Sequence, residues 1–89
     1  MLDLAVHKIF NKDLKKAKLN PTNTAKLFLY ISLLLNEKEL PSEARDHQLS
    51  GNYQDTREFH ISGDLLVIYR IEEGILELLR MGTHSQLFK

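Results

Sequence analysis

Residues 53–81 read YQDTREFHISGDLLVIYRIEEGILELLRM and hold three strand-like stretches separated by two short turns. In residues 53–61, polar and apolar side chains alternate, which is typical of a strand with one buried face. Residues 65–71 are apolar on both faces, as expected of a central strand. A Ser-Gly turn and a Glu-Glu-Gly turn separate these stretches from each other and from residues 75–81. We therefore expect three consecutive strands in a mostly antiparallel sheet.

The preceding residues predict one short strand and two helices. Residues 2–6 alternate in polarity and fit a short half-buried strand. Residues 8–19 repeat apolar side chains at helical spacing and carry lysines on the other face, and an Asn-Pro pair ends this helix. A second, mostly apolar helix is expected from Ala25 to about Glu37, with N-cap candidates in residues 22–24.

The predicted element order is β-α-α-β-β-β, followed by a short C-terminal turn or helix. Helices gathered on one side of a sheet define the α+β fold class. We expect two N-terminal helices packed on a small, mostly antiparallel sheet. No repeat or linker divides the sequence, so residues 1–89 are expected to form a single domain.

The composition is that of an ordinary folded domain. The chain has 12 Lys+Arg and 12 Asp+Glu, a formal net charge of zero and 43% hydrophobic residues, which excludes intrinsic disorder. The absence of cysteine excludes a disulfide scaffold and a thiolate metal site. No stretch has the length of a membrane span, and the N-terminus lacks the features of a signal peptide. We therefore expect a cytoplasmic protein without a membrane partner.

The neutral total hides an uneven charge distribution. Residues 1–36 carry six lysines and two aspartates, a net charge of +4, whereas residues 37–89 carry six basic and ten acidic side chains, a net charge of −4. This asymmetry indicates either a charged partner for one half or a solvated, lysine-rich helix face.

Candidate acid–base groups lie at the turn between the first two strands of the 53–81 segment. His60 and Asp64 flank the Ser62-Gly63 turn, which could bring their side chains together. A carboxylate beside an imidazole favours the charged ring and fixes its tautomer, as proton transfer requires. The alternative is an exposed histidine near a turn in which Asp64 is simply the turn residue.

A second pair lies at the end of the third strand. Arg80 and His84 occupy even positions with Leu76 and Leu78, so they are expected on the same side of that strand. The planar guanidinium suits a phosphate, and a nearby histidine can supply a proton. Alternatively, Arg80 is a surface residue that pairs with a glutamate.

The histidines have no metal-site spacing and there are no thiolates, so neither a metal nor a cofactor is predicted. Metal-free RNA cleavage uses these residue types. The 2′-hydroxyl is the nucleophile, a general base takes its proton, cations stabilise the phosphorane, and a general acid protonates the leaving 5′-oxygen. DNA lacks the nucleophile and would be spared.

Four motifs in the C-terminal half carry a specific resemblance. They are Asp46-His47-Gln48-Leu49-Ser50-Gly51, Arg57-Glu58-Phe59-His60, Asp64-Leu65-Leu66-Val67-Ile68-Tyr69 and Arg80-Met81-Gly82-Thr83-His84-Ser85-Gln86-Leu87-Phe88. In this order and spacing they resemble the YafQ-type branch of the RelE/ParE toxin superfamily. The resemblance implies the toxin of a type II toxin–antitoxin module, an endoribonuclease that cleaves mRNA in the ribosomal A site.

The resemblance also implies roles for individual residues. The implied acid–base residues are His47, His60, Asp64 and His84. We expect His60, paired with Asp64, to lie near the 2′-hydroxyl, and we expect His84 to act as the general acid. Arg80 is expected to bind the scissile phosphate and Phe88 to place the substrate. Further substrate contacts are expected from Arg57, from Tyr53, which can stack on a base where many relatives have tryptophan, and from Lys15 and Lys16.

The implied partners are a cognate antitoxin of the DinJ or RelB type with an acidic segment, mRNA and the ribosome. Operator DNA is expected to be bound only through the antitoxin complex. Two alternatives remain open, a ParE-like non-catalytic inhibitor that acts by protein binding and an RNase of the same fold that needs no ribosome. The four filled acid–base positions favour a nuclease, because ParE-type members generally lack them.

Overall fold

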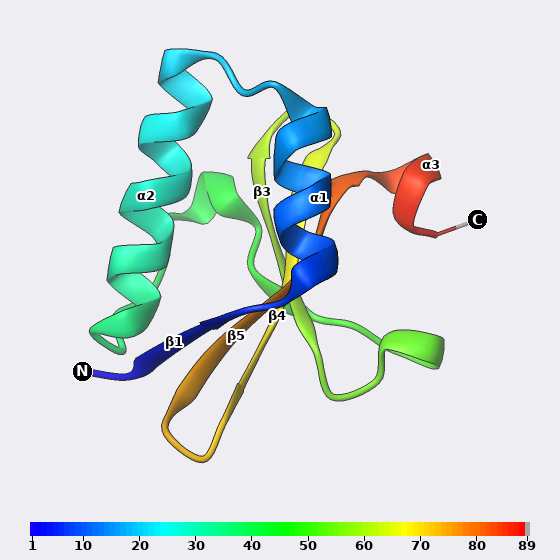
Figure 1. Cartoon of the computed structure of the whole chain (residues 1–89). Helices are drawn as coiled ribbons and strands as arrows, with labels where there is room; N and C mark the ends of the chain where they lie inside the picture. The colour runs from blue at the N-terminus through cyan, green and yellow to red at the C-terminus, as the bar shows by residue number, and fades with distance from the viewer. Residues whose placement is uncertain (89) are drawn as a thin grey trace.

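The computed structural model describes residues 1–88 (Figure 1). The strands are β1 (Asp3–Val6), β2 (His47–Gln48), β3 (Arg57–Ser62), β4 (Leu65–Glu72) and β5 (Ile75–Thr83). The helices are α1 (Lys8–Ala17), α2 (Pro21–Leu35) and α3 (His84–Leu87), with 3₁₀ turns η1 (Ser42–Ala44) and η2 (Gly51–Tyr53).

The described strands form one mixed sheet in the order β1-β5-β4-β3-β2. Strand β1 runs parallel to β5, as Figure 1 shows, and all other neighbours are antiparallel. The predicted α+β fold with a mostly antiparallel sheet is confirmed. The short strand β2, inside the polar connection between α2 and β3, was not predicted.

The two faces of the sheet are covered differently. On one face, Phe10 of α1 and Leu27, Tyr30 and Leu34 of α2 pack in a core with apolar side chains of β3, β4 and β5. On the other face, Leu66 and Ile68 of β4 pack with Leu87 of α3 in a smaller apolar cluster. The helices α1 and α2 therefore leave the second face to α3 and to the segment that carries β2 and η2.

The predicted alternation along β3 decides which side chains reach each face. Phe59 and Ile61 belong to the helix-covered core, so Glu58 and His60 project to the opposite face. Both are nevertheless buried, at 1% and 7% exposed. A candidate acid–base group is therefore enclosed on the less covered side of the sheet.

An irregularity in β5 corrects the predicted placement of Arg80. Tyr69 pairs with Leu78 and Ile68 with Arg80, so β5 has one extra residue at this point. The bulge reverses the alternation of β5, and Leu78 and Met81 both enter the helix-covered core. Arg80 consequently shares the face of Ile68 instead of that of Leu78.

Local backbone chemistry accounts for the shifted boundaries. The first helix ends at Ala17, two residues early, because Lys18 adopts a left-handed conformation with φ 48°. The second helix begins at Pro21, and the Asn20 side chain caps it by accepting from the Asn23 N–H at 2.8 Å. Strand β3 begins at Arg57 instead of residue 53, because η2 and the positive φ of 72° at Asp55 interrupt the extended chain.

No helix among residues 1–88 is long and apolar enough to cross a membrane.

We expect Phe59→Ala to lower the free energy of unfolding by about 3–5 kcal/mol. Phe59 is 0% exposed and its ring packs against Tyr30 and Tyr69, at centroid distances of 5.6 and 5.7 Å. Urea unfolding followed by circular dichroism measures the change. The matched control is Phe28→Ala, which removes a ring that is 66% exposed and should change stability by less than about 0.5 kcal/mol. Equal losses in the two variants would contradict this description of the core.

Candidate active site

Three of the four predicted acid–base residues are histidines that form a row on the less covered face of the sheet. His47 lies on β2, His60 on β3 and His84 at the start of α3. The ring centroids of His47 and His60 are 6.4 Å apart, and those of His60 and His84 are 6.2 Å apart. The fold thus brings together imidazoles from positions 47, 60 and 84 of the chain.

His60, in the centre of the row, has partners at both ring nitrogens. Its Nε2 lies 2.8 Å from Oε2 of Glu58, and its Nδ1 lies 2.9 Å from a terminal nitrogen of Arg45. The side chains of His60 and Glu58 are only 8% and 2% exposed. The predicted pairing of His60 with Asp64 is therefore wrong. Glu58, two residues away on the same face of β3, takes the position expected for Asp64.

Asp64 pairs with His84 instead. Its Oδ1 lies 3.5 Å from Nδ1 of the ring and accepts from the His84 backbone N–H at 3.3 Å. A capping box holds this end of α3, because the Thr83 hydroxyl accepts from the Gln86 N–H and the Gln86 side chain accepts from the Thr83 N–H. Both His84 and Asp64 are more than half exposed, so this pair faces solvent.

His47 connects the loop to the buried carboxylate. Its Nδ1 donates to the Arg45 carbonyl at 2.7 Å, since a carbonyl oxygen can only accept. Its Nε2 lies 3.5 Å from Oε2 of Glu58. Glu58 therefore lies between two imidazoles.

Sequence reasoning missed Glu58 and Arg45. The i, i+2 spacing of Glu58 and His60 on an alternating strand would have indicated Glu58. Arg45 had no such signal, because it follows η1 in an irregular connection and reaches a histidine fifteen positions later.

Tyr53 and Phe88 lie beside the histidine row. The Phe88 ring centroid is 5.0 Å from that of His84 and 5.3 Å from that of Tyr53. The Tyr53 hydroxyl donates to the Leu87 carbonyl at 3.2 Å. The two aromatic rings thus support the C-terminal segment that carries His84.

Arg80 is held by a carboxylate of α1. Its Nε donates to Oδ2 of Asp13 at 2.8 Å, and the Met81 N–H donates to the same oxygen at 3.0 Å. Burial alone would raise the pKa of Asp13, but the hydrogen bonds from Arg80 and Met81 outweigh it and hold that pKa below its usual value. The hydrogen bond to Asp13 raises the pKa of Arg80. A cleft of about 450 Å³ between α1 and α3 is lined by both of these side chains and by Lys16.

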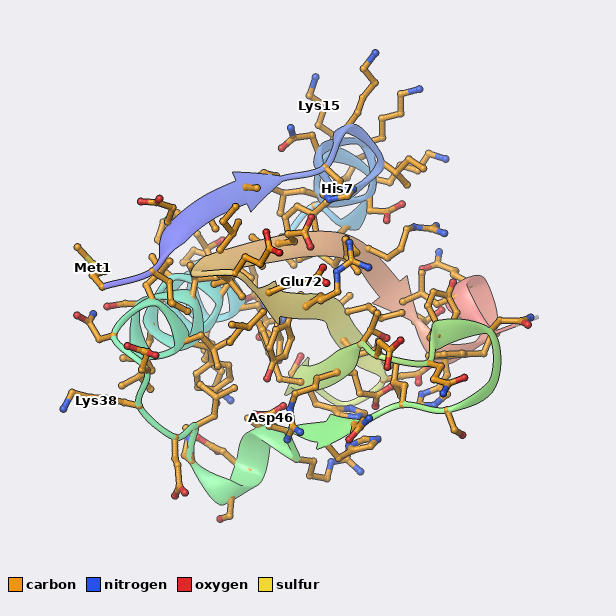
Figure 2. The ribbon with its side chains drawn as sticks, turned by 90° about the horizontal axis from the view of Figure 1, so that it is seen from below. Met1, His7, Lys15, Lys38, Asp46 and Glu72 are labelled. Carbon is orange, nitrogen blue, oxygen red and sulfur yellow. The ribbon has the colours of Figure 1, made fainter. Side chains whose placement is uncertain are left out.

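The other predicted substrate contacts lie apart from the histidine row. Arg57 pairs in register with Tyr69, so it projects to the face opposite His60, and its Nε lies 3.2 Å from Oδ1 of Asp46. Lys15 and Lys16 are exposed on α1, and Figure 2 shows Lys15 pointing away from the sheet. The structure therefore does not bring Arg57 and Lys15 together with the histidines.

This site has the groups that acid–base cleavage of RNA needs, and comparison with known proteins identifies the family. The family described as "Bacterial toxin of type II toxin-antitoxin system, YafQ" matches residues 2–89. The mRNA interferase toxin YafQ of Escherichia coli is 34% identical over 80 residues, which are 89% of this chain and 87% of that protein. The chain belongs to the YafQ family of bacterial toxins of type II toxin–antitoxin systems.

Solved structures agree over the whole fold. YafQ in the DinJ–YafQ complex of Escherichia coli has a TM-score of 0.87 at 31% identity, with all of both chains covered. A copper-bound mutant toxin from Helicobacter pylori has a TM-score of 0.92 at 38% identity, with 99% of this chain and 100% of that chain covered. Within residues 1–88 of the present chain, no three His, Asp or Glu side chains are arranged to hold a metal ion.

We expect Asp13→Asn to lower the free energy of unfolding at pH 7 by about 1.5–3 kcal/mol, the usual value of hydrogen bonds to a charged group. Because the pKa of Asp13 is depressed, its stabilisation is present above the usual carboxyl pKa and is lost as pH falls through the folded-state value. The difference between wild type and Asp13→Asn should therefore shrink below about pH 4. Urea titrations at several pH values measure it. Asp3→Asn, at an exposed position, serves as the control, and a pH-independent difference would contradict the assignment.

Proposed function

We propose that this chain is the toxin of a type II toxin–antitoxin module and that it is an endoribonuclease that cleaves mRNA. The observation that carries the proposal is two carboxylate–imidazole pairs with ring centroids 6.2 Å apart. One pair is His60 with Glu58 and the other is His84 with Asp64. A family match over residues 2–89 and the interferase activity named for the Escherichia coli relative support the same function.

We assign His60 as the general base. Glu58 accepts the Nε2 proton, so Nδ1 is the nitrogen that can take a proton from the 2′-hydroxyl. The buried carboxylate then stabilises the imidazolium that forms, as an acidic residue does behind the histidine of a hydrolytic triad. In this scheme His47 lies beside the same carboxylate, with its Nε2 3.5 Å from Oε2 of Glu58.

We assign His84 as the general acid. Asp64 contacts its Nδ1 side, which leaves Nε2 to protonate the departing 5′-oxygen. Arg80 reaches the same face of the sheet, and its permanent charge suits the phosphorane. Phe88 and Tyr53 provide aromatic surfaces on which a neighbouring base can stack.

We further propose that cleavage takes place in the ribosomal A site, in the cytoplasm. The lysines of α1 are exposed and supply a basic surface to contact phosphates of the ribosome or the mRNA. Lys16, which lines the cleft beside Arg80, would connect that surface to the site.

The proposed protein partner is a DinJ-like antitoxin. YafQ of Escherichia coli, which shares the fold at a TM-score of 0.87, is found in complex with DinJ. An acidic segment of the antitoxin would complement the lysines of α1. We propose that operator DNA is bound only by the toxin–antitoxin complex.

We expect His84→Ala to reduce cleavage by about 10²–10⁴-fold, the usual contribution of a general acid. The measurement is single-turnover cleavage of a short mRNA on purified ribosomes, together with growth arrest on induction in cells. His7→Ala is the matched control, because His7 precedes α1 and pairs with Glu77 outside the site. Full activity of His84→Ala would overturn the assigned acid. Growth arrest without RNA cleavage, unchanged in this variant, would favour an inhibitor that acts by protein binding.

We expect the Lys15→Gln/Lys16→Gln double variant to bind ribosomes more weakly and with a smaller salt dependence. Each lost phosphate contact should lower the slope of log K against log salt by about 0.7–0.9. Sedimentation at several salt concentrations gives the slope. Lys38→Gln is the control, because Figure 2 shows Lys38 on the other side of the molecule from Lys15. An unchanged slope in the double variant would exclude these lysines from the contact.

A further inference from the structure

Arg45 is an exposed cation whose side chain contacts the proposed base. It follows η1 with φ 48°, a left-handed conformation unusual for a residue with a side chain. One terminal nitrogen of its guanidinium lies 2.9 Å from Nδ1 of His60. Among residues 1–88, no carboxylate forms a salt bridge with Arg45, whereas the other described arginines, Arg57, Arg70 and Arg80, each have one. The guanidinium of Arg45 therefore contacts an imidazole nitrogen, Nδ1 of His60, instead of a carboxylate.

This contact fixes where the proton of His60 lies. A guanidinium can only donate, so Nδ1 must be the acceptor and must carry no proton. The ring proton is then on Nε2, where Glu58 accepts it at 2.8 Å. In the free protein, the lone pair that would take the 2′-hydroxyl proton is covered by Arg45.

The other titratable groups around His60 have their own contacts. Glu58 on β3 accepts from Nε2 of His60, and Asp64 lies 3.5 Å from Nδ1 of His84 on α3. His47 on β2 contacts Glu58 and donates its Nδ1 proton to the Arg45 carbonyl. Arg45 is thus the group that contacts Nδ1, and a donor at this position requires the nitrogen to carry no proton.

We propose that Arg45 is a phosphate-responsive cover on His60: it holds the ring neutral with Nδ1 blocked, and a substrate phosphate draws the guanidinium away and frees Nδ1 to act as base. An anionic phosphate oxygen is a much stronger acceptor for arginine than a neutral imidazole. An exposed arginine without a carboxylate partner can move to it without breaking an ion pair. Arg45 is then a positioning residue, and its role rests on the proposed function of His60.

The first test reads the proton on His60 directly. The full chain, labelled with ¹⁵N in its histidine rings, is compared by NMR with Arg45→Met, Arg45→Lys and Arg70→Met across a pH series. In wild type and in Arg45→Lys, we expect Nδ1 of His60 to have the shift of an unprotonated acceptor and Nε2 that of a protonated nitrogen. In Arg45→Met, Nδ1 should gain a proton near neutral pH. Arg70→Met is the control, because Arg70 pairs with Glu77 at the far end of β4, and its His60 spectrum should match wild type.

The second test supplies the phosphate. A 2′-O-methyl oligoribonucleotide provides the phosphodiester backbone without the nucleophile and is titrated into wild type, with inorganic phosphate in a parallel titration. In wild type, the oligonucleotide should shift Nδ1 of His60 by more than it does in Arg45→Met, where there is no guanidinium to displace. A response to the oligonucleotide alone identifies the RNA backbone as the ligand, and an equal response to inorganic phosphate identifies any phosphate. If Arg45→Met does not fold, the wild-type titration and Arg45→Lys still decide the question.

The outcomes separate this inference from the proposed function. If the His60 spectrum is the same in wild type and a folded Arg45→Met, or if the oligonucleotide leaves wild-type Nδ1 unchanged, Arg45 is no cover even where wild type cleaves RNA. If the spectra behave as expected but wild type cleaves no RNA on ribosomes, the proposed function is wrong and the contact remains. If both proposals are correct, kcat/KM of Arg45→Met at pH 6 should be at least about tenfold below that of wild type, because Nδ1 of His60 would be free of a proton in few molecules. The difference should shrink as the pH rises.

Discussion

The arrangement of the histidine row depends on one buried carboxylate, that of Glu58. Removing an ionised carboxylate from water costs several kcal/mol unless donors surround it. Its donor is Nε2 of His60 at 2.8 Å, and Nε2 of His47 lies 3.5 Å away. Satisfying Glu58 therefore fixes the ring of His60 on β3, next to the two-residue strand β2 that pairs with it. Once His60 is fixed in this way, its second nitrogen points to Arg45, and the chemistry of the site follows from that orientation.

The sheet supplies the second constraint, through its alternation and the bulge in β5. Without the extra residue, Arg80 would lie on the same side as Leu78 and enter the apolar core under α1 and α2. The bulge keeps Met81 in that core and turns Arg80 to the face of the histidines. Gly82 follows, and a side chain there would meet the Gln86 side chain of α3, since an added Cβ would lie 2.8 Å from Oε1. Close contact of α3 with β5 at this glycine places His84 within 6.2 Å of His60.

The sequence was sufficient to predict the features that depend on local periodicity. It was insufficient to predict those that depend on how the strands pair in register. Alternation predicted the faces of Phe59 and His60, and helical spacing predicted two N-terminal helices. The partner of His60 could not be predicted, because the distance along the chain to Asp64 says nothing about which carboxylate shares a strand face. Arg45 was missed for a stronger reason. Its contact with His60 requires a left-handed residue after η1 and a two-residue strand, and neither feature produces a periodic pattern in the sequence. Spacing indicated His60, Asp64 and His84 as candidates, and the resemblance to a family added His47 and the acid–base roles.

The two carboxylate–imidazole pairs differ in exposure, and this difference assigns their roles better than residue type does. A general acid must regain its proton from solvent in each turnover, and His84, whose side chain is 56% exposed, can exchange directly with water. A general base must present one lone pair in a fixed direction, and His60, only 8% exposed, is held at Nε2 by Glu58. Both rings must return to their starting protonation state after each turnover, but exchanging the roles would ask the exposed ring to keep one orientation against a half-exposed aspartate. The asymmetry of burial therefore favours proton flow from the 2′-hydroxyl to His60 and from His84 to the 5′-oxygen.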